Sequence, residues 1–195
     1  MMNQVLRSRY AWIFALLLLG VSTRFATYLI EDYPQNFTAL GAVALFGAAS
    51  FRTMKWGLLA PMFALLLSDV VYELVQPGYG FYGATQFVVY GAFALMAWVG
   101  RGLSSGSMDR RTPLHIGGRA LMASSLFFVI TNFSVWLTSG LYAKSFAGLM
   151  QCYWAALPFF RHQLLGTLFF TAVLFGLAAW IHNRITDLNP ASARV

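Results

Sequence analysis

The residues best suited to chemistry are polar groups that lie inside long apolar stretches of the chain. Arg24, Asp69 and Asn132 each stand about 13 or 14 residues, or roughly 20 Å of helix, from the start of such a stretch. An unpaired charge in the middle of a bilayer costs at least about 2.5 kcal/mol, so ionisable residues there are candidates for binding or transport. Arg24 and Asp69 are predicted to form an ion pair, because each lowers the cost of burying the other. The alternative is a structural clamp between two helices.

Other polar residues share this depth. Asn36 and Thr38 begin the second apolar stretch, Thr85 and Gln86 begin the fourth, and Arg161 and His162 begin the last. Side chains scattered at random would not share one level, so the pattern predicts a cavity open to the outer side of a membrane. Asn132 also has a simpler interpretation, a hydrogen bond between helices. The predicted ligand-binding residues are Arg24, Asp69, Asn132, Arg161, Tyr79, Phe81, Tyr82 and Trp154.

The four aromatic members of this set lie on the same side as the polar residues. Three of them fall between glycines in the segment 77–83, whose sequence is PGYGFYG. Glycine gives such a loop conformational freedom, and aromatic rings offer flat apolar surface to a ligand. The alternative is an ordinary belt of aromatic residues at the membrane interface.

Composition indicates which elements must position these groups. The chain has 195 residues, of which 59% are hydrophobic and 10% charged, and its mean hydropathy is +0.65. Soluble domains carry about 25% charged residues, so the chain is predicted to be an integral membrane protein of a single domain. Continuous apolar runs favour helices over barrel strands, which gives an all-α fold. The six predicted transmembrane helices are residues 10–29, 37–51, 56–75, 85–99, 118–139 and 162–181.

Basic residues predict the orientation of these helices. Ten of them, among them Arg7, Arg52, Arg101 and Arg184, fall in the N-terminus, alternate loops or the C-terminus, whereas Lys144 is alone on the opposite side. The excess of positive charge marks the cytoplasmic side, so both termini are predicted to be cytoplasmic, in the bacterial inner membrane. Residues 100–117 then form a cytoplasmic loop. Residues 140–160, which contain Pro158, are predicted to form an outer lid, with a re-entrant or spanning segment as alternatives.

Small residues one helical turn apart allow two helix backbones to approach closely. The pairs are Ala11 and Ala15 in the first helix, and Ala44 and Ala48 in the second. Both pairs are candidate docking sites for a partner protein, with packing inside the chain as the alternative.

The sequence lacks the residues that several kinds of chemistry require. The three histidines have no ligand-like spacing and there is one cysteine, Cys152, so no metal site, no cofactor and no disulfide framework are predicted. No P-loop, G-x-S-x-G or H-E-x-x-H motif is present. Basic residues are explained by membrane orientation, so no nucleic-acid partner is expected; the partners are membrane lipid and a small solute.

Four stretches and the arrangement around them point to a known family. The stretches are residues 36–47 (NFTALGAVALFG), 67–69 (LSD), 131–136 (TNFSVW) and 152–161 (CYWAALPFFR). With six short helices and Ala11-x-x-x-Ala15, the chain resembles the S-component of energy-coupling-factor vitamin transporters and an allied group of uncharacterised bacterial membrane proteins. The resemblance implies high-affinity binding of a vitamin-like solute from outside. It also implies that Ala11 and Ala15 dock on a transmembrane coupling subunit driven by two ATPases.

Three functions are therefore weighed. The leading hypothesis is a solute-binding membrane subunit of a transport system, which is not an enzyme. The second is a structural or assembly subunit of a larger membrane complex, and it predicts that the outer cavity is filled by the protein's own side chains. The third is a membrane enzyme that uses His162 or Cys152 as base or nucleophile.

Overall fold

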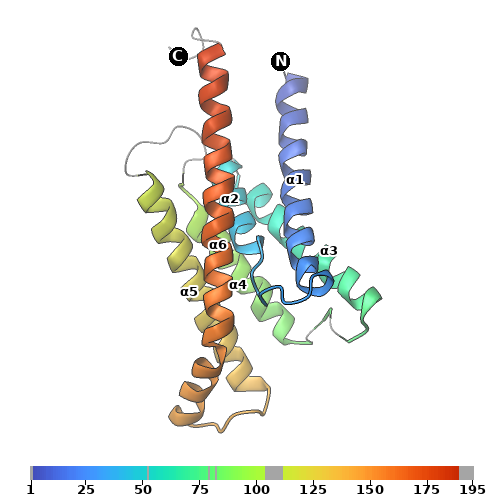
Figure 1. Ribbon diagram of the computed structural model, residues 1–195, viewed down its shortest axis with the longest axis vertical. Helices are drawn as coiled ribbons and strands as arrows, with labels where there is room; N and C mark the ends of the chain where they lie inside the picture. Colours follow the sequence, from blue (N-terminus) through green and yellow to red (C-terminus); the bar gives the residue numbers. More distant parts are fainter. Residues whose placement is uncertain (1, 52, 79, 82, 104–111, 189–195) are drawn as a thin grey trace.

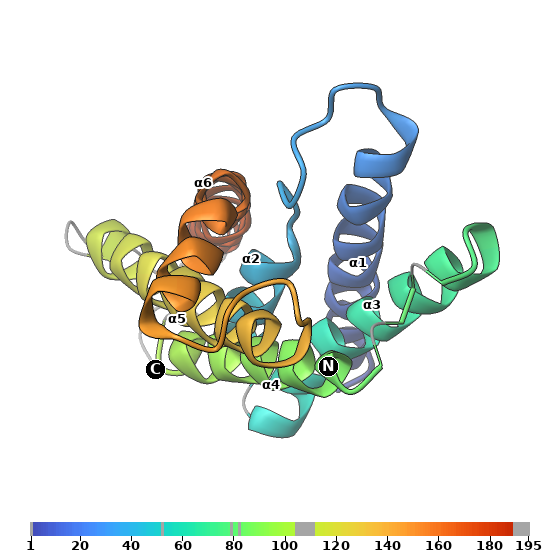
Figure 2. The ribbon, with the colours of Figure 1, turned by 90° about the horizontal axis from the view of Figure 1, so that it is seen from below.

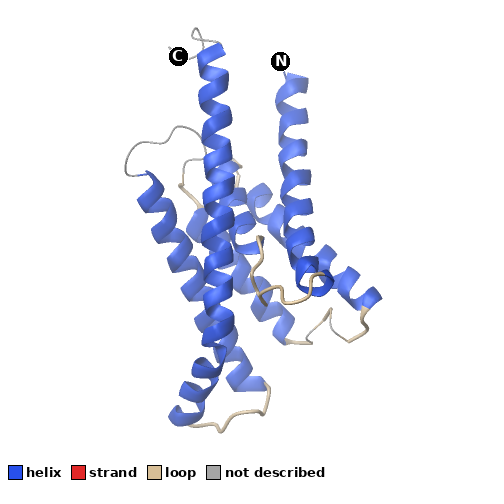
Figure 3. Ribbon diagram, in the orientation of Figure 1, coloured by secondary structure: helices blue, strands red, loops and turns tan. Residues whose placement is uncertain are grey.

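The computed structural model describes residues 2–51, 53–78, 80, 81, 83–103 and 112–188. These residues form six α-helices and, within the described ranges, no strand (Figure 3), which confirms the all-helical prediction. The helices are α1 (Met2–Leu29), α2 (Leu40–Ser50), α3 (Met54–Val75), α4 (Thr85–Gly100), α5 (Thr112–Thr138) and α6 (Phe146–Leu188).

Three of the helices are long and apolar enough to cross a membrane. They are α3 from Lys55 to Val75, the whole of α5, and α6 from Phe146 to Arg184. The other apolar helical stretches are shorter: Ile13–Ala26 in α1, and the helices α2 and α4. At 1.5 Å per residue, α2 is only about 16 Å long, compared with about 30 Å of hydrocarbon in a bilayer.

Successive helices run in alternating directions, so that the two chain ends lie at the same end of the molecule (Figure 1). Around α2, contacts join α1 to α3, α3 to α4, α4 to α5, and α5 to α6. Within the described residues α1 and α6 do not contact each other, so this ring of five helices is open on one side. The loop between α1 and α2, residues 30–39, crosses that opening (Figure 2).

Helix α2 is the centre of the molecule because it is apolar on every face. Its residues from Leu40 to Ala48 are all buried, and it packs against each of the other five helices. Glycine allows these close contacts. A Cβ atom on Gly57 of α3 would lie 2.8 Å from Ala48 Cα, and one on Gly100 of α4 would lie 2.7 Å from Leu45 Cα. A short helix surrounded in this way needs no polar face.

Two predicted segments differ from the observed ones. The predicted span 37–51 begins as non-helical chain and becomes helical only at Leu40. Irregular backbone is tolerated at membrane depth where it is buried in protein or lines a cavity, and Asn36 and Thr38 line one here, as described below. The predicted cytoplasmic loop 100–117 is shorter than expected, because α5 begins at Thr112.

The predicted outer lid, residues 140–160, is helical for most of its length. Only residues 139–145 form a loop, and α6 begins at Phe146 instead of residue 162. Pro158 lies inside α6 and has no N–H to donate to residue 154, which explains why the first turns of α6 bend away from the rest (Figure 2). These turns pack on α5, where Tyr153 donates a hydrogen bond to Val129 O at 2.9 Å. Proline therefore bends this helix without ending it.

Candidate functional site

Arg24 lies near the C-terminal end of α1 and reaches across to α3. Its Nη1 atom donates hydrogen bonds to Ser68 Oγ at 2.7 Å and to Leu65 O at 3.4 Å, and forms an ion pair with Asp69. The guanidinium carbon lies 5.3 Å from the ring centroid of Tyr72, whose hydroxyl donates to Arg24 O at 2.9 Å. The ion pair expected from the sequence is therefore present, and α3 holds both the side chain and the backbone of Arg24.

Asp69 is completely buried and both of its carboxylate oxygens have partners. Oδ1 faces Arg24, whereas Oδ2 accepts hydrogen bonds from Gln86 Nε2 and, at 2.7 Å, from the Tyr90 hydroxyl. Asp69 thereby links α1, α3 and α4. The sequence predicts it as a ligand-binding residue, but it does not line the cavity described next, so its role is to position Arg24.

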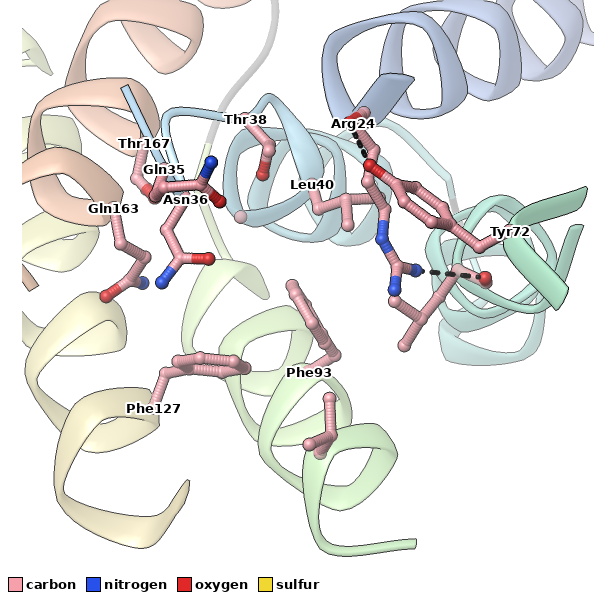
Figure 4. Close-up of a pocket in the computed structure, with 13 residues that line it drawn as sticks. Arg24, Gln35, Asn36, Thr38, Leu40, Tyr72, Phe93, Phe127, Gln163 and Thr167 are labelled. Carbon is pink, nitrogen blue, oxygen red and sulfur yellow. Dashed lines mark hydrogen bonds between the residues drawn. The ribbon is translucent and has the colours of Figure 1, made fainter. Parts of the chain in front are cut away.

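A cavity of about 340 Å³ lies beside Arg24 (Figure 4). Arg24 is near the C-terminal end of α1, which lies away from the end of the bundle that holds both chain termini (Figure 1). All six helices and the α1–α2 loop contribute to its lining. The lining combines polar and apolar side chains. The polar lining comes from Arg24, Gln35, Asn36, Thr38, Gln163 and Thr167, and the rest from Leu40, Gly41, Leu65, Tyr72, Val89, Phe93 and Phe127.

The α1–α2 loop, residues 30–39, covers the side of this cavity that lies between α1 and α6. It is fastened to α1 by a hydrogen bond of 3.0 Å from Ala39 N to Thr23 Oγ1. On the other side, the ring of Phe37 lies 5.7 Å from that of Phe170, and a Cβ atom on Gly166 would lie 3.0 Å from Thr38 N. The loop, and not residues 140–160, is therefore the cover of the cavity.

Tyr33 stabilises the conformation of this loop. Its hydroxyl donates a hydrogen bond of 3.0 Å to Phe37 O, and the two rings pack edge to face. Burial raises the pKa of the Tyr33 phenol above its ordinary value, so the hydroxyl keeps the proton that it donates.

A second cavity of about 210 Å³ adjoins the first and shares Asn36, Phe127 and Gln163 with it. Asn132 lines this second cavity, as the sequence led us to expect. Its Nδ2 donates a hydrogen bond of 2.8 Å to Phe128 O within α5, so the hydrogen bond that it makes is inside its own helix.

The remaining predicted ligand-binding residues do not line either cavity. Arg161 is exposed on α6, Trp154 is 77% exposed and Phe81 is 44% exposed. Trp154 points away because the first turns of α6 pack on α5 through other residues, among them Cys152 and Tyr153. Tyr79 and Tyr82 lie outside the described residues. The proposal that outer-loop aromatics stack on a ligand is therefore not supported by Phe81 or Trp154.

The small residues divide between surface and interior. Ala15 is exposed on α1, whereas the side chain of Ala11 lies outside the described part of the chain. Ala44 and Ala48 are buried inside α2, so neither offers a surface on which a partner could dock. Their structural role is close packing within the bundle.

The sequence reasoning missed the polar residues of α6. Gln163, Thr167 and Thr171 recur every fourth residue in an otherwise apolar segment, so they share one helix face. Gln163 and Thr167 line the cavity, and Thr171 is buried one turn beyond it. This spacing is the signal that would have found them. Phe93 and Phe127 carried no such signal, because they are aromatic residues within apolar helices.

Cys152, which was considered for nucleophilic chemistry, has a packing role. Cys152 is buried, and its Sγ donates to Asn132 O at 3.4 Å, so it packs α6 on α5. Within the described residues, no cluster of three His, Cys, Asp or Glu side chains is placed to hold a metal ion. The cavity beside Arg24 is therefore the candidate site.

Comparison with known protein families gives one match, over residues 4–190, to the family of unknown function DUF6580, and the chain belongs to this family. No curated protein and no solved structure matches the chain significantly. Family membership thus names no ligand and no reaction, and the function has to be argued from the cavity.

Proposed function

We propose that this protein is the solute-binding membrane subunit of a transport system, and that its ligand occupies the cavity beside Arg24. The observation that carries the proposal is the cavity itself. Its volume of about 340 Å³ falls within the range of small-molecule sites, and its lining is drawn from every helix. A cavity kept open between packed helices forfeits contacts between side chains, so a protein without a ligand would gain stability by filling it.

The lining has the composition of a binding site. Phe93 and Phe127 lie with their ring centroids 4.8 Å apart and give one apolar wall. Beside the Phe127 ring, Asn36 and Gln163 direct amide groups towards the cavity (Figure 4), and neither side chain has a hydrogen-bond partner within the described residues. Apolar walls with a few orienting polar groups are typical of small-molecule sites.

The proposal includes six membrane crossings with both chain ends in the cytoplasm. Arg101, Arg119 and Arg184 lie at the same end of the bundle as the termini, which is the distribution expected for the cytoplasmic side. The cavity then lies in the outer half of a bacterial cytoplasmic membrane, where the α1–α2 loop separates it from the external solution.

A coupling partner is part of the same proposal. Ala15 is exposed on α1 between the exposed side chains of Phe14 and Leu18, so this face of α1 is accessible within the bilayer. A small residue on an accessible apolar face allows close approach of another transmembrane helix. We assign this face to the coupling subunit, which two ATPases would drive.

Equilibrium binding tests the proposal. The full-length protein, purified in detergent, is titrated with a panel of radiolabelled water-soluble vitamins, and we expect saturable binding of at least one. Gln163→Trp fills the junction of the two cavities and should abolish that binding. Leu165→Trp is the matched control, because Leu165 is 48% exposed on the same helix and lines neither cavity. Equal loss in both variants, or no saturable binding to the wild type, would reject the proposal.

A further inference from the structure

The lining of the main cavity has an uneven charge. Arg24 is its one charged residue, and none of the described lining residues is acidic. The Asp69 carboxylate lies outside the lining, but its Oδ1 is ion-paired with Arg24, so the two charges largely offset each other. The guanidinium is the member of the pair that lines the cavity, which leaves a weak preference for an anion over a cation.

The start of α2 adds to this preference. Leu40 and Gly41 line the cavity, and the first intrahelical hydrogen bond of α2 runs from Val43 N to Ala39 O. The N–H groups of residues 40, 41 and 42 therefore precede the helical hydrogen-bond ladder. Such groups carry the positive end of the helix dipole, which binds carboxylate and phosphate groups.

A buried hydroxyl group at the same place gives independent evidence of a ligand. Thr167 is only 1% exposed and lines the cavity, yet its side chain has no hydrogen-bond partner within the described residues. A Cβ atom on Gly41 would lie 2.5 Å from Thr167 Oγ1, so this hydroxyl stands directly against the first turn of α2. Because Thr167 lines the cavity, its hydroxyl is available to donate to an acceptor there, whereas Thr171 Oγ1, which is also without a partner, is buried away from the cavity.

The rest of the lining suggests what carries that acceptor. Phe93 and Phe127, at an interplanar angle of 57°, form an apolar wall together with Val89 and Leu65. Rings packed at such angles bind flat apolar groups by stacking and edge contacts. The remaining amide groups, from Asn36 and Gln163, can satisfy polar atoms at the edge of a ring.

We propose that the ligand is a planar ring compound with a carboxylate group. This inference names a ligand class for the proposed function and rests on that function. The carboxylate accepts hydrogen bonds from the first turn of α2 and from Thr167, and Arg24, although ion-paired with Asp69, is the cationic group of the lining. The ring lies against Phe93 and Phe127. A ring compound that carries a basic amine is excluded from this site by the same groups.

Three probes with one ring system test the charge preference. They are 2-naphthoate, 2-naphthamide and 2-naphthylmethylamine, titrated against the full-length protein in detergent by equilibrium dialysis. We expect 2-naphthoate to bind at least about tenfold more tightly than the amide, and the amine not to bind. Tighter binding of the amide or the amine would overturn the carboxylate proposal and leave the cavity as a binding site. If none of the three binds, the carboxylate proposal fails, whereas the proposed function is decided by the vitamin titration described above.

Paired threonine variants test the position of the carboxylate. Thr167→Val keeps the shape of the side chain and removes the hydroxyl, so the affinity for 2-naphthoate should fall about tenfold while that for 2-naphthamide changes less. Thr171→Val is the control, because Thr171 is equally buried one turn away and does not line the cavity. Unchanged affinity in Thr167→Val, or the same loss in Thr171→Val, would contradict the proposed geometry. Thermal unfolding of both variants establishes that they fold.

Discussion

At the scale of single residues, Arg24 and Asp69 have different roles although they form one ion pair. Arg24 lines the cavity, whereas Asp69 lies beyond it and is completely buried. A buried carboxylate is costly unless its oxygens are paired, and here Arg24, Gln86 and Tyr90 together provide the partners. The pair thus fixes the position of Arg24, while contact with a ligand is left to Arg24 alone.

Removal of the Arg24 side chain alone should strongly destabilise the folded protein. Arg24→Ala leaves the Asp69 carboxylate buried without its ion-pair partner, and we expect the variant to lose about 3–5 kcal/mol of stability. The double variant Arg24→Gln, Asp69→Asn removes both charges and keeps groups able to form hydrogen bonds, so most of that loss should be recovered. Apparent unfolding temperatures in detergent measure both. A double variant no more stable than Arg24→Ala would show that the ion pair is not the main cause.

The depth of site residues could be predicted from the sequence, but their direction could not. Counting along apolar stretches placed Arg24, Asp69 and Asn132 near one level, and the structure has Arg24 and Asp69 in contact. The same counting gave no information on the face of the helix to which a side chain belongs. Arg161 and Trp154 lie near that end of α6 but on exposed faces, because packing between helices sets the rotation of each one.

At the scale of elements, the α1–α2 loop and α2 act as one unit. The loop crosses the opening between α1 and α6, and α2 then runs through the centre of the bundle. A sequence pattern cannot distinguish this from a longer helix, since residues 37–39 (FTA) continue the uncharged run of α2. Tertiary contacts determine that the helix begins at Leu40, because Phe37 packs on α6 and Ala39 N donates a hydrogen bond to Thr23 of α1.

The contact between this loop and α6 can be tested at one glycine. Gly166→Ala places a Cβ atom 3.0 Å from Thr38 N and 3.1 Å from Thr38 O, so the loop must shift away from α6. We expect a loss of about 1–3 kcal/mol in stability, together with weaker ligand binding. Gly176→Ala is the matched control, because a Cβ atom there meets nothing within 4 Å. It should change stability by no more than about 1 kcal/mol, in the stabilising direction.

Thermal unfolding and the binding assay described above measure both glycine variants. The result that would contradict the role of the loop is Gly166→Ala with wild-type stability and wild-type affinity. A loss of stability without a loss of affinity would mean that the loop packs on α6 but does not shape the cavity.

At the scale of the whole molecule, the arrangement of helices bears on how many of them cross the membrane. Only α3, α5 and α6 are both long and apolar enough by themselves, and three crossings would place the two chain ends on opposite sides. The helices alternate in direction, however, and both ends lie at one end of the bundle (Figure 1). An even number of crossings fits this arrangement. The short apolar stretch of α1 and the short helices α2 and α4 pack beside the long helices, and local thinning of the bilayer accommodates short spans.

Six crossings make a definite prediction about accessibility. In a Cys152→Ala background, single cysteines at exposed positions Glu31, Thr53, Arg101 and Leu141 are treated with a membrane-impermeant thiol reagent. Cysteines at 31 and 141 should react in intact cells, and those at 53 and 101 only after permeabilisation, because each pair lies on one face of the bundle. The critical comparison is between 31 and 53, which are separated by the α1–α2 loop and α2 alone. If both react from the same side, α2 does not complete a crossing, and the cavity above it cannot belong to a six-helix transport subunit.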